Sequence, residues 1–274
     1  MAFAVSRGRI LTWALEAHVT DHCNLRCAHC CTLSPHLGPR VLDPAELERD
    51  LRAAARALRP AVFKLTGGEP LLHPDILACV RVARASGISD QISLTTNGLL
   101  LGGAPEALFE GLDRLTVSDY SSAPLPERLL LTVRERCARH GVHLTVKRID
   151  RFQRMDPETA LSEAEAHDVH SSCWLKVRCH MIRDGRFYAC TRPPHIEARL
   201  RSLGRHTALA EADGVELGGP FLLRRLLGYL ESDEPLASCR HCLGTSGAWD
   251  GHRQLARAAV PPAGRHVTTA RMAR

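Results

Sequence analysis

The feature that most constrains the fold is an alternation of strand and helix patterns between residues 13 and 149. Short apolar or alternating runs predict strands at 13–21, 61–68, 91–98, 114–121 and 143–149. Amphipathic runs between them predict helices at 43–58, 73–87, 104–112 and 125–141. Strands that alternate with helices form a parallel sheet with right-handed crossovers, so we predict an α/β fold.

The polar residues at the ends of successive strands favour a partial (β/α) barrel of five to six units over an open doubly wound sheet, because barrel active sites lie at the carboxyl ends of the strands. The alternation stops near residue 170, after one more expected helix at 157–169. Residues 177–191 predict a β-hairpin with Asp184 and Gly185 at its turn, and 221–232 predict a helix.

These patterns give three predicted regions. They are a barrel at 10–170, a small extension of hairpin and helix at 171–247, and a disordered tail at 248–274.

The chain carries eleven cysteines but no export signal, because Arg7 and Arg9 interrupt the apolar stretch that a signal peptide needs. No run approaches the ~20 apolar residues of a membrane span. We therefore expect a soluble cytoplasmic protein whose clustered thiols bind metal or take part in catalysis. Its 36 basic and 30 acidic residues are interspersed, and only 4% of residues are aromatic, so neither a nucleic acid nor a membrane is an expected partner.

The stretch "HVTDHCNLRCAHCC" at 18–31 follows the first strand and contains C-x3-C-x2-C at Cys23, Cys27 and Cys30. Three thiolates from one loop suit a cluster of soft iron atoms, whereas structural zinc sites use C-x2-C pairs. Three ligands for a four-iron cube also leave one iron free to bind a substrate or cofactor.

This loop, with His29 just before its last ligand, resembles the signature of the radical S-adenosylmethionine (radical SAM) enzymes. Further motifs of that family follow in order, as "GGEP" at 67–70, "SLTTNG" at 93–98 and "TVSDYS" at 116–121. The resemblance covers about residues 10–150.

The resemblance implies that Cys23, Cys27 and Cys30 hold a 4Fe–4S cluster that chelates S-adenosylmethionine and cleaves it to a 5′-deoxyadenosyl radical. An external electron donor of the flavodoxin or ferredoxin type would supply the electron. Glu69 is expected to bind the ammonium group, and Gly67 and Gly68 to allow close backbone approach. The residues implied in cofactor binding are His29, Gly67, Gly68, Glu69, Pro70, Thr95, Asn97 and Ser118.

A second set of thiols comprises Cys190, Cys239 and Cys242, with Cys173 or Cys179 as a fourth member. Their arrangement resembles the twitch extension, a truncated SPASM domain that holds one auxiliary 4Fe–4S cluster. Family spacing favours Cys173 as the fourth ligand, whereas a two-residue hairpin turn places Cys179 opposite Cys190.

A zinc ribbon is the alternative interpretation of this second set, because C-x2-C also suits zinc. The remaining thiols carry less information. Cys79 and Cys137 are predicted core residues, and Cys31 is either a bystander or a thiol near the first cluster.

The size and layout resemble twitch-type enzymes of antibiotic biosynthesis that act on sugars, aminocyclitols or aminoglycosides. We therefore expect a small hydroxyl-rich substrate that undergoes dehydrogenation, epimerisation or dehydration, with a redox outcome favoured. Candidate catalytic residues are Asp119, Tyr120, Lys147, Arg148 and, as a hydrogen donor if it is not a ligand, Cys179.

Two alternatives remain open. One is a maturase that modifies a ribosomally made peptide, although the barrel begins within about ten residues of Met1, where such enzymes carry a winged-helix segment. The other is a non-catalytic iron–sulfur or zinc scaffold.

Overall fold

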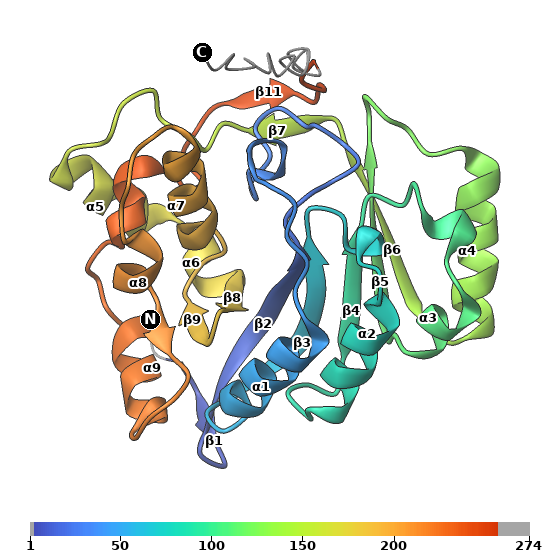
Figure 1. Ribbon diagram of the computed structural model, residues 1–274, viewed down its shortest axis with the longest axis horizontal. Coiled ribbons are helices and arrows are strands. Elements are labelled where there is room, and N and C mark those ends of the chain that lie inside the picture. The colour runs from blue at the N-terminus through green and yellow to red at the C-terminus, as the bar shows by residue number, and fades with distance from the viewer. Residues whose placement is uncertain (1–2, 257–274) are drawn as a thin grey trace, which may run out of the picture.

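A computed structural model describes residues 3–256 of the chain (Figure 1). Its centre is a parallel sheet of β2 (Arg9–Thr20), β3 (Leu58–Gly67), β4 (Ile92–Thr96), β5 (Arg114–Tyr120) and β6 (His143–Ile149). Within the described residues the sheet stays open, with β6 at one end and the short β10 (Val215–Glu216) at the other. The predicted α/β fold of partial-barrel type is confirmed.

Four helices cover one face of this sheet, as Figure 1 shows. They are α1 (Pro44–Ala54), α2 (Ile76–Ala85), α3 (Glu106–Glu110) and α4 (Glu127–Arg139). Asp43 caps α1 by accepting a hydrogen bond from the Ala45 amide, as its sequence pattern predicts. Short 3₁₀ turns precede or separate these helices at Ser34–His36, Pro70–Leu72 and Leu101–Gly103.

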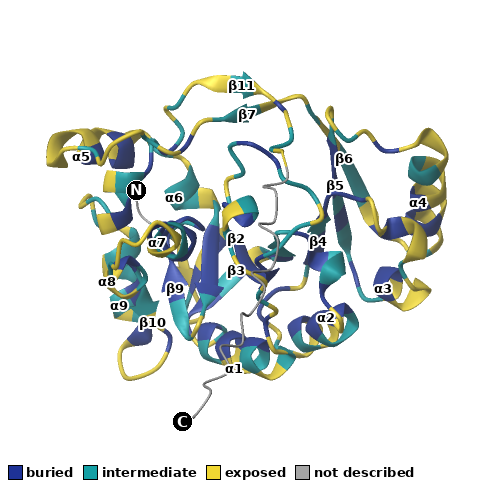
Figure 2. Ribbon diagram, turned by 45° about the horizontal axis from the view of Figure 1, so that its top comes forward, coloured by how far each residue is buried: buried dark blue, intermediate teal, exposed yellow. Residues whose placement is uncertain are grey.

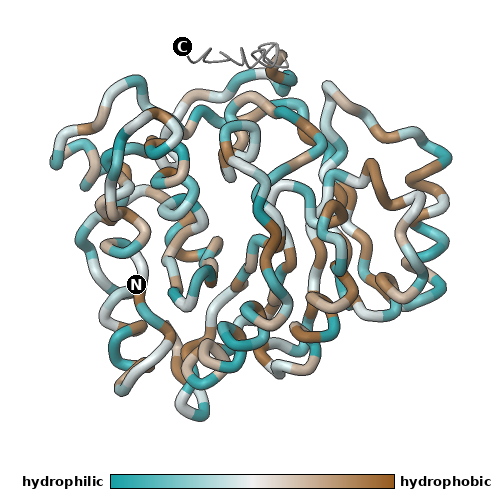
Figure 3. The backbone as a smooth tube through the Cα atoms, in the orientation of Figure 1, coloured by the Kyte–Doolittle hydropathy of each residue, from teal (hydrophilic) through white to brown (hydrophobic). Residues whose placement is uncertain are grey.

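The main hydrophobic core lies between the sheet and these helices. In the second half of β2, the odd-numbered residues Leu15, Ala17 and Val19 pack there with Leu47 and Leu51 of α1. Cys79 and Cys137 belong to the same core, which confirms their predicted role. Since side chains alternate along a strand, even-numbered residues of β2 point to the other face, which we call the lumen. Strands β2, β4 and β5 are mostly buried, whereas β6 is partly exposed (Figure 2). Apolar stretches of the chain run through the middle of the molecule (Figure 3).

The later part of the chain continues the same sheet. β8 (His180–Arg183) pairs in parallel with β2, and β9 (Arg186–Tyr188) pairs antiparallel with β8 and β10. The predicted hairpin is confirmed, with positive φ angles at Asp184 (53°) and Gly185 (72°). Leu222 and Leu226 of α9 (Leu222–Leu230) join the main core, so the extension shares its core with the barrel.

Several elements differ from the predicted pattern. The helix expected at 157–169 is α5 (Glu163–Ser172), which starts at a capping box made by Ser162 and Glu165. Three short helices were not predicted: α6 (Leu175–Arg178), α7 (Pro193–Ser202) and α8 (Leu209–Asp213). Two prolines open α7, a signal that in sequence marks a turn as readily as a helix start.

The prediction of a disordered tail from residue 248 is wrong for residues 248–256. β11 (Trp249–Gly251) pairs antiparallel with β7 (Arg151–Gln153), and the two cross the top of the molecule (Figure 1). The rest of the predicted tail, 257–274, lies outside the described residues. In the described part of the chain, no helix has both the length and the apolar character needed to span a bilayer.

Candidate active site

The cysteine loop lies at the carboxyl end of β2, where it borders a cavity of about 270 Å³. Positive φ angles at His29 (60°) and Leu33 (57°) fold the loop back over the strand ends. The cavity wall includes Cys23, Cys27, Cys30, Cys31, Gly67, Gly68, Thr95, Asn97, Ser118 and Tyr120. The structure thus brings the predicted cluster ligands together with most of the predicted cofactor-binding residues. His29 stands apart from the wall, with its Nε2 3.1 Å from the Asp250 carboxylate.

The three thiols suit a cluster better than a single ion. Within residues 3–256, no three His, Cys, Asp or Glu side chains converge closely enough to hold one metal ion. Burial is the main cause that raises the pKa of Cys23 to about 11 and that of Cys27 to about 12, and the neighbouring thiols contribute to both shifts. Such groups become thiolates only beside a strong positive charge, which an iron–sulfur cluster provides.

Hydrogen-bond donors already point at these sulfurs. The Leu25 amide lies 3.4 Å and Asn97 Nδ2 3.7 Å from Cys23 Sγ. The Gln254 side-chain amide lies 3.5 Å from Cys27 Sγ. Donors to sulfur are one of the means by which proteins tune iron–sulfur clusters, so the donor set also fits the group.

Gly67 and Gly68 are required by packing against the end of β2. A Cβ at Gly67 would lie 2.2 Å from the Thr20 carbonyl oxygen, and one at Gly68 2.1 Å from that of His22. Gly67 also has a φ of 138°. Both residues also line the cavity. The missing side chains therefore let this backbone pack closely against Thr20 and His22 on one side and leave room in the cavity on the other.

Glu69 does not match its expected role as an ammonium ligand. The side chain is fully buried and does not line the cavity. Its carboxylate accepts hydrogen bonds from Thr96 Oγ1 (2.6 Å), the Asn97 amide (2.8 Å) and the Leu71 amide (3.0 Å). Burial raises the pKa of this carboxyl group, and these hydrogen bonds oppose the rise. Glu69 therefore joins the "GGEP" loop to the end of β4, and the buried Pro70 only starts the following turn.

The four candidate substrate contacts at the strand ends lie on two different faces of the sheet, because side chains alternate along each strand. Tyr120 lines the cavity beside Ser118. Asp119 points to the opposite face, where it accepts hydrogen bonds from the Leu125 amide (2.9 Å) and from Arg148 (2.7 Å). Asp119 and Arg148 thus form a pair outside the cavity. Lys147 pairs in register with Ser118, so it faces the lumen without lining this cavity.

A segment that the sequence pattern missed closes over the cysteine loop. We call residues 249–255 the strap. Its Gln254 side chain accepts a hydrogen bond from the Arg26 amide (2.6 Å), and the Leu255 amide donates to the Arg26 carbonyl (2.7 Å). His252 stacks on Tyr120 with ring centroids 4.7 Å apart. The only local signal was an aromatic residue followed by a turn pair at Trp249–Gly251, within a segment that otherwise lacks periodicity.

The second cysteine set also converges. Cys173, Cys190, Cys239 and Cys242 line one small cavity of about 20 Å³ together with Lys176 and Arg192. Burial raises the pKa of Cys190 well above its usual value, and the other three thiols add to the effect. Two of the four come from the 3₁₀ segment Ala237–His241 and the residue after it.

Cys179 lies apart from this set. Its backbone (φ −119°, ψ 55°) ends helix α6, and β8 begins one residue later, so the hairpin pairing expected between Cys179 and Cys190 does not extend that far. Burial raises the pKa of Cys179 to about 12; Glu16 and Cys173 contribute to the rise, and Lys64 and Lys147 oppose it. Met181, two residues after Cys179, pairs in register with Glu16, which in turn pairs with Lys64, so Cys179 lies next to two lumen residues that sequence reasoning did not single out.

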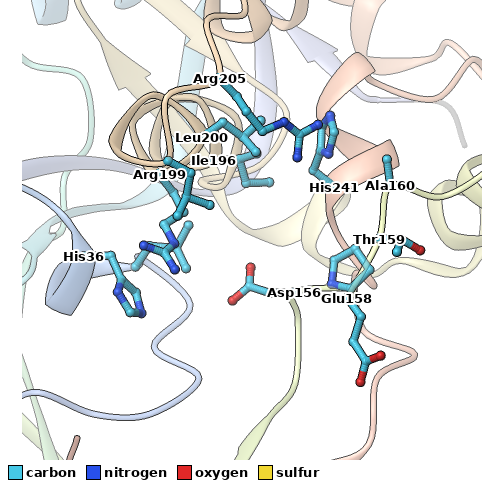
Figure 4. A pocket seen from close by; sticks show the side chains of 13 residues that line it. His36, Asp156, Glu158, Thr159, Ala160, Ile196, Arg199, Leu200, Arg205 and His241 are labelled. Atoms are coloured by element: carbon cyan, nitrogen blue, oxygen red, sulfur yellow. The ribbon is translucent and has the colours of Figure 1, made fainter. Parts of the chain in front are cut away.

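A further cavity, of about 210 Å³, lies behind the cysteine loop (Figure 4). Basic side chains point into it, from His36, from Arg199 of α7, from Arg205 in the loop after α7 and from His241, opposite Asp156 and Glu158. No thiol and no strand end contributes to its wall among the described residues, so it is separate from both cysteine sets.

Comparison with known proteins agrees with this geometry. The model of the Radical SAM superfamily matches residues 18–165. A GTP 3′,8-cyclase of Mycobacterium marinum is 44% identical over 108 residues, which are 38% of this chain and 30% of that protein. A GTP 3′,8-cyclase of Aquifex aeolicus is 40% identical over 116 residues, which are 40% of this chain and 36% of that protein. The chain thus spans only about a third of the length of these relatives.

Among solved structures, BtrN in complex with AdoMet and 2-DOIA superimposes with a TM-score of 0.54. The match covers 87% of this chain and 96% of BtrN, at 15% sequence identity. At that identity the likeness establishes a shared fold over nearly the whole described chain.

Proposed function

The chain belongs to the radical SAM superfamily and is an enzyme, and on that premise we propose that it removes a hydrogen atom from a carbon of a small hydroxyl-rich compound. The proposed substrate class is a sugar, an aminocyclitol or an aminoglycoside, as in antibiotic biosynthesis. The observation that carries this proposal is the lumen beside the cysteine loop. It combines hydroxyl groups at Thr95, Ser118 and Tyr120 with charges of both signs at Glu16 and Lys64.

In this proposal Cys23, Cys27 and Cys30 hold the 4Fe–4S cluster. A cluster bound there supplies the electron that cleaves S-adenosylmethionine. The protein itself positions the reacting molecules and keeps water away from them. Gly67, Gly68 and Asn97 form one wall of the cavity, and Tyr120, on which His252 stacks from outside the cavity wall, forms part of another. The strap then covers the loop, which limits access of water to the reacting atoms.

We propose that the region 171–247 is a twitch-like extension whose four thiols hold an auxiliary 4Fe–4S cluster. Cys173 serves as the fourth ligand, since it lines the same cavity as Cys190, Cys239 and Cys242, and Cys179 does not. Arg192, which is 1% exposed, lies among these thiols and offsets their negative charge. Such a cluster can accept one electron from the substrate, so the proposed outcome is oxidation. A flavodoxin or ferredoxin supplies the electron for the first cluster.

A second candidate function is the cyclisation of GTP, which rests on the names of the similar relatives. Lys64 and Lys147, both on the lumen side of the sheet, are groups that could bind phosphates. The carboxylate of Glu16 beside Lys64 disfavours a polyphosphate at that point, so we place this candidate second.

The test is incubation of the anaerobically reconstituted enzyme with S-adenosylmethionine and dithionite, together with one of four compounds. These are 2-deoxystreptamine, neamine, glucosamine and GTP, each analysed by mass spectrometry. We expect 5′-deoxyadenosine and a product two mass units lighter from 2-deoxystreptamine or neamine. Conversion of GTP alone would replace the proposed function by the second candidate. Absence of 5′-deoxyadenosine under all conditions would contradict radical SAM chemistry itself.

A further inference from the structure

Glu16 lies on the lumen face of the sheet, close to the walls of the cofactor cavity. It pairs in register with Lys64 of β3, and two residues further on His18 pairs with Thr66, which lines the cavity. Two residues of strand span about 7 Å, so Glu16 lies one layer below the cavity wall. Met181 of β8 pairs in register with Glu16, and Cys179 precedes Met181 by two residues.

A chain of two histidines supports the Glu16 carboxylate from one side. His18 Nε2 lies 3.1 Å from Glu16 Oε1, and His18 Nδ1 lies 2.7 Å from His195 Nε2. Both imidazoles are buried, with 6% of His18 and 1% of His195 exposed. His195 comes from α7, so the chain links β2 of the barrel to the extension.

The hydrogen bonds define the tautomers if Glu16 is ionised. A carboxylate can only accept, so His18 must donate from Nε2. Its Nδ1 then accepts from His195, which therefore carries its proton on Nε2. His195 Nδ1 is left as a bare nitrogen, and it is buried without a partner among residues 3–256. Burial lowers the pKa of His195 well below its usual value, which agrees with a neutral ring.

Within residues 3–256, the other carboxylate oxygen of Glu16 has no hydrogen-bond donor and only a long ion pair. Among the described residues Oε2 accepts no hydrogen bond, and its nearest cation is Lys64 Nζ at 4.0 Å. The side chain is 11% exposed, on the lumen side. The fully buried Glu69, by contrast, has both oxygens hydrogen-bonded. Glu16 instead has one oxygen fixed and one oxygen open toward the lumen.

We infer that Glu16 is a catalytic residue that accepts the hydroxyl proton of the substrate, and that His18 and His195 are its positioning residues. The inference rests on the proposed function. Hydrogen abstraction from an H–C–O–H carbon leaves a carbon radical that still carries its hydroxyl group. The O–H bond then breaks, its proton goes to Glu16 Oε2, and one electron passes to an iron–sulfur cluster of the extension. The carbon–oxygen bond becomes a carbonyl, so two hydrogens leave in total.

The test compares Glu16→Gln with wild type, using the compound of the panel that wild type consumes, deuterated at its reacting carbon. A positioned base contributes roughly 10²- to 10⁴-fold to rate, so we expect product formation to fall at least about 100-fold. Deuterium should still pass into 5′-deoxyadenosine, because hydrogen abstraction precedes proton transfer. Glu135→Gln, an exposed change on α4, is the matched control and should leave both rates unchanged.

The positioning role is tested at His195. His195→Gln keeps a donor near the position of Nε2 and should retain most coupling, whereas His195→Leu should raise the ratio of 5′-deoxyadenosine to product about tenfold. This is less than the roughly 10²-fold or larger effect of losing the base itself, because Glu16 is still present. In ¹⁵N-histidine spectra of the reconstituted enzyme, the protected N–H signals of His18 and His195 should persist in Glu16→Gln, since the amide oxygen still accepts. That persistence separates loss of the base from loss of structure.

Two results would overturn the inference. One is a Glu16→Gln enzyme that forms product within twofold of wild type, and the other is loss of deuterium transfer in parallel with product. Failure of the proposed substrate class is a separate result. Consumption of GTP alone rejects the proposed substrate class without any Glu16 variant, whereas the two results above reject the base while the substrate class stands.

Discussion

The two cysteine sets are built in opposite ways. The first three thiols come from one loop of eight residues, Cys23 to Cys30, and border a cavity of about 270 Å³. The other four come from three separate segments around Cys173, Cys190 and 239–242, and enclose a cavity of about 20 Å³. Catalytic zinc sites keep one coordination position free for a reacting molecule, whereas structural zinc sites do not, and the two cysteine sets differ in the same way. The first set leaves room for a reacting molecule, and the second leaves none.

One buried side chain lies between the two sets. Arg192 follows Cys190 by two residues and donates a hydrogen bond to the Cys31 carbonyl oxygen (2.8 Å). It also pairs with Asp156. A small second core, which includes Leu33 and Cys242, joins the same two regions. The two sets therefore differ in their surroundings but are in contact through Arg192 and this second core. Variants of each set should affect cofactor cleavage and product formation differently.

The largest expected effect follows from emptying the open set. Replacement of Cys23, Cys27 and Cys30 by Ala should remove about four irons per chain, since these thiols supply all protein ligands of one cluster. It should also abolish formation of 5′-deoxyadenosine. Iron analysis and chromatography of the reaction check both expectations. Cleavage of S-adenosylmethionine by the triple variant would show that the open cavity is not the reaction site.

Replacement of Cys239 and Cys242 by Ala should have the next largest effect and a different pattern. Iron content should fall by about half, because a cluster that loses two thiolates is not retained. Uncoupled 5′-deoxyadenosine formation should continue while product disappears. Zinc, rather than iron, bound to these positions in anaerobically purified protein would contradict an electron-accepting role for the closed set.

The fourth ligand of the closed set gives a sharper comparison. Cys173→Ala should lower iron content toward about half, whereas Cys179→Ala should retain it at a packing cost of ~1 kcal/mol. The reason is that Cys173 lines the closed cavity, and Cys179 lies next to the lumen residues Glu16 and Lys64. If Cys179→Ala keeps its iron but traps a substrate radical, Cys179 is a hydrogen donor and the outcome is epimerisation. The reverse pattern of iron loss would restore Cys179 as the ligand.

The contrast between the sets also explains what the sequence could predict. The first set is local, because its ligands share one loop and the neighbouring strand ends follow from a short alternating pattern. The surroundings of this set were less predictable wherever a segment distant in the sequence supplies the contact. Gln254 reaches Cys27 from more than two hundred residues away, and Glu16 is distinguished only by contacts with His18, His195 and Lys64. No spacing in the sequence encodes such contacts.

The same reasoning explains the positions that came out differently. Strand parity turns Asp119 away from the cavity, although it lies between two residues that line it. Glu69 is turned inward because three donors surround it, two at the end of β4 and one in the turn Pro70–Leu72 that follows Glu69. Cys179 is withdrawn from the hairpin because helix α6 ends there. In each case a motif located the segment, and backbone geometry decided the direction of the side chain.

The strap offers a milder way to disturb the open set. Gln254→Leu removes the acceptor for the Arg26 amide and the donor to Cys27 Sγ. Leaving a partly buried amide unpaired costs about 1–3 kcal/mol, so the cysteine loop should loosen. We expect faster loss of the first cluster in air, followed by its absorbance, with the second cluster unaffected. Arg253→Leu, an exposed neighbour in the strap, is the matched control and should behave as wild type.

The smallest effect is expected at Asp213, which organises the closed set from outside. Its buried carboxylate accepts hydrogen bonds from the Ala237 amide (2.6 Å) and the Ser238 amide (2.8 Å), at the start of the turn that carries Cys239. Asp213→Ala leaves both donors unpaired and should lower the free energy of unfolding by about 1–3 kcal/mol. Asp213→Asn keeps one acceptor and should cost less. Because the thiols themselves remain, iron content should be preserved, and the effect should appear in denaturant melts rather than in product yield. A loss of iron as large as in the Cys239 and Cys242 variant would show instead that the closed set depends on this cap for its metal.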